Sequence, residues 1–140
     1  MTRSFSIVVL TLSAVLSSAL DAGGPVVQPS GQIEWKASGS LPPGVEYHLI
    51  YEDKATRAVQ ILVRMPKGYS LPTHTHSHDE TILVLKGKVS LEFSGKSHTL
   101  GPGGYALIPA KTPFSIAAGG FGGAQFFASF NGPYDLKTAN

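Results

Sequence analysis

Apolar and polar residues alternate along most of the chain from Val45 onward. Val89, Leu91 and Phe93, for example, are separated by Ser90 and Glu92, which is the period-two pattern of a strand with one buried face. The same reasoning predicts strands at 47–51, 57–65, 81–85, 89–93, 98–100, 105–108, 114–117 and 124–130. No segment in this part shows a sustained period of 3.6 residues, and Gly and Pro recur at short intervals. The pattern therefore predicts an all-β sandwich or barrel.

The N-terminal part has a different character. Residues 1–22 combine Arg3, an uncharged apolar middle and small residues near position 19, which is the composition of a secretory signal peptide. Residues 23–40 are rich in Gly and Pro and are expected to form a leader, and 41–137 are expected to form the β-barrel domain. We therefore expect a secreted or periplasmic protein with no membrane contact after cleavage.

The composition narrows the functional classes. The 140 residues carry 11 Lys and Arg against 9 Asp and Glu, a net charge of +2. That excess is too small and dispersed for a nucleic-acid-binding surface, so we expect no nucleic-acid partner. The chain contains no Cys. A metal would therefore be held by His, carboxylate or water, and cysteine nucleophiles and iron–sulfur clusters are excluded.

The candidate chemistry is concentrated in residues 74–80. Three of the five histidines lie here, at His74, His76 and His78, and Glu80 follows two residues later. If the stretch is extended, all four side chains point to one face. Imidazoles and a carboxylate on one face are ligands for a divalent transition metal such as iron, zinc, nickel or manganese. The alternative interpretation is an exposed loop that is rich in histidine.

The spacing of these residues resembles the first motif of the cupin superfamily. That motif has a glycine, five residues, His-x-His, three or four residues, a glutamate, six residues and a glycine. Gly68, His74, His76, Glu80 and Gly87 fill every fixed position. The resemblance implies a jelly-roll β-barrel with the metal inside, bound by His74, His76 and Glu80. It also implies a homodimer, because many cupins pair through their sheets.

The second cupin motif is incomplete. Gly103 and Pro109 match it, but Lys111 stands where a glycine is usual, and Phe114 stands where the family has its third histidine ligand. The segment 131–136, Asn-Gly-Pro-Tyr-Asp-Leu, is also similar to the end of small bacterial single-domain cupins. Phe114 is expected to form an apolar wall beside the site.

Three arrangements of the site remain open. His74, His76 and Glu80 form a triad with open coordination positions, which suits iron(II) or a catalytic zinc. Alternatively, His78 replaces the missing histidine. In the third arrangement the metal is no longer held tightly, and the pocket binds an organic ligand. Further candidates for lining the barrel are Tyr47, His48, Glu92, Tyr105 and Gln125.

Three functions follow from these arrangements. The first is a metal-dependent enzyme, oxygenase-like, acting on a small molecule. The second is a barrel that binds a small molecule or metal without turnover. The third is an interaction module in which the metal is structural. The sequence identifies neither the substrate nor the metal.

Overall fold

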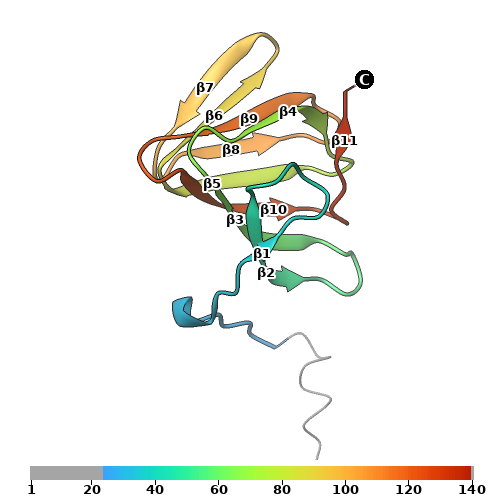
Figure 1. Cartoon of the computed structure of the whole chain (residues 1–140). Coiled ribbons are helices and arrows are strands. Elements are labelled where there is room, and N and C mark those ends of the chain that lie inside the picture. Colours follow the sequence, from blue (N-terminus) through green and yellow to red (C-terminus); the bar gives the residue numbers. More distant parts are fainter. Residues whose placement is uncertain (1–23, 140) are drawn as a thin grey trace, which may run out of the picture.

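The computed structural model describes residues 24–139, so the signal peptide predicted for 1–22 lies outside the described residues. Two antiparallel sheets face each other (Figure 1). The first has the order β1-β2-β3-β10-β5-β8 and consists of Lys36–Ala37 (β1), Glu46–Glu52 (β2), Val59–Met65 (β3), Ala124–Phe130 (β10), Glu80–Lys86 (β5) and Tyr105–Ile108 (β8). The second has the order β11-β4-β9-β6-β7 and consists of Lys137–Thr138 (β11), Ser70–Thr75 (β4), Phe114–Gly119 (β9), Lys88–Phe93 (β6) and Lys96–Leu100 (β7).

The eight predicted strands agree with these bounds to within a few residues, whereas β1, β4 and β11 were not among them, and the all-β class is confirmed. The two facing sheets have the architecture of a jelly roll. Apart from the strands, the described part contains one 3₁₀ helix, Ser30–Gln32 (η1). No helix within residues 24–139 has the length and apolar character needed to span a bilayer.

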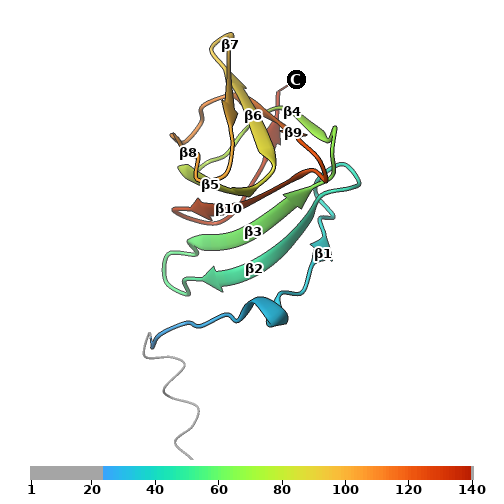
Figure 2. The same cartoon turned by 90° about the vertical axis from the view of Figure 1, so that its left-hand side faces the viewer.

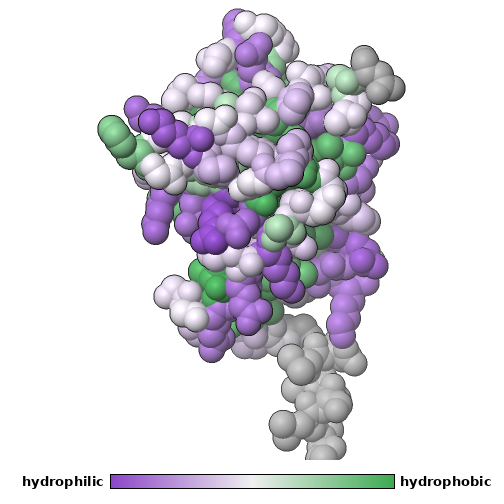
Figure 3. All heavy atoms as spheres, viewed as in Figure 1, coloured by the Kyte–Doolittle hydropathy of each residue, from purple (hydrophilic) through white to green (hydrophobic). Residues whose placement is uncertain are grey.

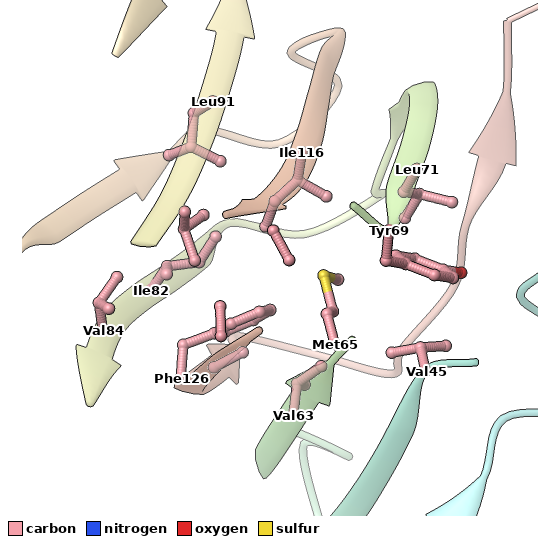
Figure 4. Packing of buried hydrophobic residues seen from close by; sticks show 14 of the residues in the cluster. Val45, Val63, Met65, Tyr69, Leu71, Ile82, Val84, Leu91, Ile116 and Phe126 are labelled. Carbon is pink, nitrogen blue, oxygen red and sulfur yellow. The ribbon is translucent and has the colours of Figure 1, made fainter. Parts of the chain in front are cut away.

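The core lies between the sheets because each strand buries alternate residues. In β10 the buried residues are Ala124, Phe126, Ala128 and Phe130, and the residues between them are only partly buried. Side chains from both sheets meet in this space (Figure 4). On the face seen in Figure 3, hydrophilic and intermediate residues cover most of the surface, and apolar residues show between them.

The turn between β5 and β6 explains why the first motif ends in glycine. Gly87 has a φ of 71°, in the left-handed region that residues with a Cβ rarely adopt. A Cβ at this position would also overlap the carbonyl oxygen of Gly123, which comes just before β10. Gly87 is therefore required both for the turn and for the close approach of the neighbouring backbone.

Both ends of the described chain are tied to the barrel. β1, from the leader expected at 23–40, pairs with β2 at the edge of the first sheet (Figure 2). β11 pairs with β4, so that Lys137 lies opposite Thr75 and Thr138 opposite His74. The last strand is thus anchored beside the histidine-bearing strand.

One expectation about the local structure is wrong. Residues 74–80 are not a single extended stretch, because β4 ends at Thr75 and β5 begins at Glu80. The residues between them form the connection from one sheet to the other. The alternation that would place His78 on the same face as His74 and His76 therefore breaks down after Thr75.

Candidate metal centre

His74, His76 and Glu80 lie together inside the barrel. His74 is on β4, Glu80 begins β5 on the opposite sheet, and His76 lies in the connection between them. The three residues are 2%, 6% and 6% exposed. The two imidazole rings are 4.9 Å apart between centroids, and Nε2 of His76 lies 3.2 Å from Oε2 of Glu80. The connection between the sheets therefore closes over a small polar cluster.

Backbone carbonyls orient both imidazoles. Nδ1 of His74 lies 2.8 Å from the carbonyl oxygen of Pro72, and Nδ1 of His76 contacts the carbonyl oxygen of Asp135. Because a carbonyl only accepts hydrogen bonds, each Nδ1 carries the proton and donates it. Each Nε2 then has a free lone pair. This is the tautomer and support that metal-binding histidines usually have.

The connection 76–79 is itself held from two sides. Asp135 accepts hydrogen bonds through its carboxylate from the backbone N–H of Ser77, at 2.7 Å, and from the Ser77 hydroxyl. Oδ1 of Asp79 accepts a hydrogen bond from the backbone N–H of Ala110 at 2.8 Å. The backbone N–H of Lys111 donates to the carbonyl of His76 at 2.8 Å. The position of His76 is thus fixed by the C-terminal segment and by the β8–β9 loop.

The electrostatics of the two histidines differ. Burial lowers the pKa of His74, so this residue is held neutral. Burial acts in the same direction on His76, but the carboxylate of Glu80 and the carbonyl of Asp135 outweigh it and raise the pKa of His76. The carboxylate of Glu80 therefore favours a positive charge beside Nε2 of His76.

The donor set fits a metal ion. Oε2 of Glu80 is buried and has no hydrogen-bond partner, which is costly for a carboxylate. Two ligand atoms bound to one ion at about 2.0–2.2 Å lie about 2.8–3.6 Å apart at ordinary coordination angles, and the His76–Glu80 separation is within that range. As the side chains stand, no three His, Cys, Asp or Glu residues within 24–139 form a complete metal-binding group. Binding by all three residues therefore requires a side-chain adjustment.

Aromatic rings surround the cluster. Phe114 lies opposite His74 in the β4–β9 register and is 1% exposed, with its ring centroid 4.4 Å from that of His74. The rings of Phe130 and Tyr134 lie 5.1 Å and 5.7 Å from that of His76. Phe114 thus forms the apolar wall that was predicted from its place in the second motif.

The cluster opens into a cavity of about 370 Å³ between the sheets. His74, His76 and Glu80 line it, together with mainly apolar side chains and with Tyr134. Burial and the nearby charge of Glu80 raise the pKa of Tyr134 to about 12. The phenol of Tyr134 is therefore a hydrogen-bond donor at neutral pH.

His78 is not brought to the site. Its side chain does not line the cavity, and its imidazole lies against Gly132, where a Cβ would collide with the ring. Its position does not support it as the replacement for the missing histidine, and that role stays a prediction.

Of the five further residues expected to line the barrel, the structure places one in the cavity and four outside it. Tyr47 lines the cavity. His48 is buried, but its Nδ1 contacts the backbone of Glu34 outside the cavity. Glu92 and Tyr105 are exposed, and Gln125 lines a separate hollow near the β9–β10 loop.

Sequence reasoning assigned no role to Tyr134 or Asp135. Both act through contacts with residues nearly sixty positions earlier, which no local pattern reveals. The only signal was the similarity of the segment 131–136 to the end of small cupins.

Comparison with known proteins identifies the fold family. The cupin domain family matches residues 61–129. A segment of 56 residues is 45% identical to quercetin 2,3-dioxygenase of Bacillus subtilis, covering 39% of this chain and 17% of that protein. The chain thus matches about a sixth of the length of that relative.

Solved structures agree on the fold. The polyketide cyclase RemF from Streptomyces resistomycificus has a TM-score of 0.70 at 18% identity, covering 81% of this chain and 84% of its own. A putative acetylacetone dioxygenase from Methylibium petroleiphilum has a TM-score of 0.68 at 19% identity, covering 84% and 82%. A predicted oxalate decarboxylase from Thermotoga maritima has a TM-score of 0.65 at 21% identity, covering 75% and 97%. The chain belongs to the cupin superfamily.

Proposed function

We propose that this protein is an exported, metal-dependent cupin enzyme, oxygenase-like, that acts on a small molecule in the barrel. His74, His76 and Glu80 would hold a divalent transition metal. The observation that carries the proposal is the buried, unpartnered Oε2 of Glu80, 3.2 Å from Nε2 of His76. A cation between these two atoms would satisfy both of them.

Two imidazoles and one carboxylate are the ligand set of non-haem iron(II) oxygenases, and such a metal supplies open positions for substrate and dioxygen. Zinc with an open position is the other ion that this set suits. The protein's own contribution is to fix the imidazole tautomers through Pro72 and Asp135. Phe114 and Phe130 keep bulk water away from the cluster, which strengthens electrostatic interactions there.

The names of two similar proteins support oxygen-dependent chemistry, since one is a quercetin dioxygenase and another a putative acetylacetone dioxygenase. A polyketide cyclase and a predicted oxalate decarboxylase have the same fold. The fold alone therefore does not select the reaction, and the proposal depends on the site.

The second candidate is a barrel that binds a small molecule without turnover. Phe114 favours it, because an apolar ring takes the place of the third imidazole. Within residues 24–139, the cavity also has no His, Asp or Glu in its lining beyond the cluster and Glu52. Among the described residues that line the cavity, the one carboxylate independent of the metal ligands is therefore Glu52, and it is ion-paired with Arg57.

The test is whether a bound metal has open positions. The protein is loaded with iron(II) without oxygen, nitric oxide is added as a dioxygen analogue, and the complex is followed by electron paramagnetic resonance. We expect the iron–nitrosyl signal in the unmodified protein and its loss in His76→Ala. The exposed His98 provides the matched control, and His98→Ala should retain the signal. Iron uptake without nitric oxide binding would favour the non-catalytic barrel, and absence of iron uptake would overturn the metal site.

Export and self-association belong to the same proposal. The N-terminal composition supports cleavage of a signal peptide after Ala19 or, as the later alternative, after Ala22, and the intact mass of the exported chain would distinguish the two. Exposed apolar residues on the outer face of β5 and β8 support a homodimer. They are Leu83, Leu85, Tyr105 and Leu107.

A further inference from the structure

The charged residues of the cavity all lie at one end. Strand pairing places Glu52, Val59, Phe130 and Glu80 in one row across β2, β3, β10 and β5. Arg57, in the loop just before β3, forms an ion pair with Glu52 and also lines the cavity. Glu52 and Glu80 thus lie on opposite sides of the same end, three strands apart.

In the second sheet, polar and apolar residues of the cavity are likewise separated along the strands. His74 pairs with Phe114, whereas Leu71, nearer the start of β4, pairs with Ile116. Tyr134 also lines the charged end, where its ring packs against those of His76 and Phe130. Polar groups from both sheets therefore converge at this end.

The other end is apolar. Phe126 lies opposite Val63 in the β3–β10 register, and the side chains of Val63, Met65, Leu71, Ile116 and Phe126 point toward one another there (Figure 4). Polar residues of the lining near this end are Tyr47, which pairs with Val63, and Ser38, whose backbone N–H donates to the carbonyl of Val45. A strand rises about 3.3 Å per residue, so the four residues from Phe130 to Phe126 separate the two ends by about 13 Å.

We propose that the cavity binds an amphiphilic small molecule with an oxygen-bearing head at the His74–His76–Glu80 end and an unbranched apolar body reaching toward Met65 and Phe126. The orientation of the head rests on the proposed metal site, whereas the placement of the body rests on the apolar lining alone. A second charged group on the body is excluded, because the apolar end offers it no charged partner. An extended body of about eight to ten carbons matches the separation of about 13 Å between the ends.

The length of the body is measured with straight-chain 1-alkanols of increasing length, titrated calorimetrically into the metal-free protein. Affinity should rise about fourfold with each added methylene, as expected for burial of apolar surface, and should stop rising at about eight to ten carbons. An affinity that does not depend on chain length would overturn the proposal.

Two neighbouring residues of β10 provide matched variants. Ala128 faces the cavity midway between the two ends, and Ser129 faces outward. Ala128→Leu should end the rise in affinity at shorter alkanols, whereas Ser129→Leu should leave it unchanged. Ile61→Phe, at a partly buried cavity position opposite Ala128, is made in parallel in case Ala128→Leu does not fold. Unchanged chain-length dependence in the folded cavity variants would overturn the placement of the body.

The head is tested separately with zinc-loaded protein. Octanoate should bind at least tenfold more tightly than octylammonium, because the metal attracts a negative oxygen head, whereas the charge of Arg57 is compensated by Glu52. A preference for the ammonium would overturn the orientation. If zinc does not bind, the proposed metal site fails, and the alkanol series still decides the placement of the apolar body.

Discussion

Phe114 is the residue that most distinguishes this site from the usual cupin arrangement. Its ring packs on His74 from the neighbouring strand, at the point where the family motif has an imidazole. The backbone there is in register with the ligand strand. A histidine at this position would therefore face the same cluster.

Phe114→His should tighten zinc binding by at least about tenfold, because it adds a ligand to the metal. Loss of a group that only supports a ligand already weakens metal affinity by about 10–100-fold. Competition with a chromophoric chelator measures the affinity. Phe114→Leu is the control, since it also changes the packing but adds no ligand. Equal affinity in the two variants would mean that position 114 does not face the metal.

Glycines at two turns provide a second comparison among single residues. Gly87 and Gly95 both have φ near 70°, but only at Gly87 would a Cβ meet neighbouring backbone, whereas Gly95 has open space. Gly95→Ala should cost about 1 kcal/mol of unfolding free energy through backbone strain alone. Gly87→Ala should cost at least about 2–3 kcal/mol more, since the β5–β6 turn must move. Urea unfolding followed by circular dichroism measures both, and equal losses would contradict the proposed overlap with Gly123.

The C-terminal segment is the element that connects the fold to the site. β11 pairs with β4, and Asp135, just before β11, bonds both Ser77 and His76. Metal binding should therefore depend on an acidic residue that is not itself a ligand.

Asp135→Asn keeps the backbone carbonyl that orients His76 but weakens the carboxylate hydrogen bonds that hold Ser77 beside it. Zinc binding should therefore weaken by about tenfold, the lower end of the loss that is typical when a supporting contact is disturbed. Hydrogen bonds to Ser77 lower the pKa of Asp135, so its stabilisation is present above pH 4, near the ordinary pKa. It is lost as the pH falls through the lower pKa of the folded state. The difference in unfolding free energy between the variant and the unmodified protein should thus shrink below pH 4.

Asp53 offers the control for this prediction. Hydrogen bonds to Thr56 and Ala55 in the β2–β3 turn likewise lower its pKa, but it has no contact with the histidines. Asp53→Asn should change the pH dependence of unfolding and leave zinc affinity unchanged. Equal effects of the two variants on zinc would refute a specific role for Asp135.

The elements differ in how well the sequence predicts them. The sequence predicted the bounds of β10 because buried and partly buried residues alternate strictly along it. The strand also pairs with a neighbour on each side, β3 and β5. The first motif also predicted that His74, His76 and Glu80 would meet. β1, β11 and the connection 76–79 were not predicted, because they are short and depend on pairing with distant strands or on contacts with Asp135. The role of His78 was inferred from a strand that ends at Thr75.

The molecule as a whole presents an apolar outer face on β5 and β8. Leu107 is 56% exposed there, and Tyr105 is 59% exposed. We expect a dimer in light scattering, and Leu107→Asp should shift it to monomer because a buried carboxylate would lack a partner. Val27→Asp, in the exposed leader, should have no effect. A monomeric unmodified protein would contradict the expected homodimer.

The central claim is that the barrel of this cupin holds a transition metal at His74, His76 and Glu80. The most direct test is elemental analysis of the protein purified without a histidine tag. The account predicts close to one transition-metal ion per chain, lost in His76→Ala. Metal well below one ion per chain that is not restored by adding iron or zinc would contradict the account, and would leave the cavity as a site for organic ligands alone.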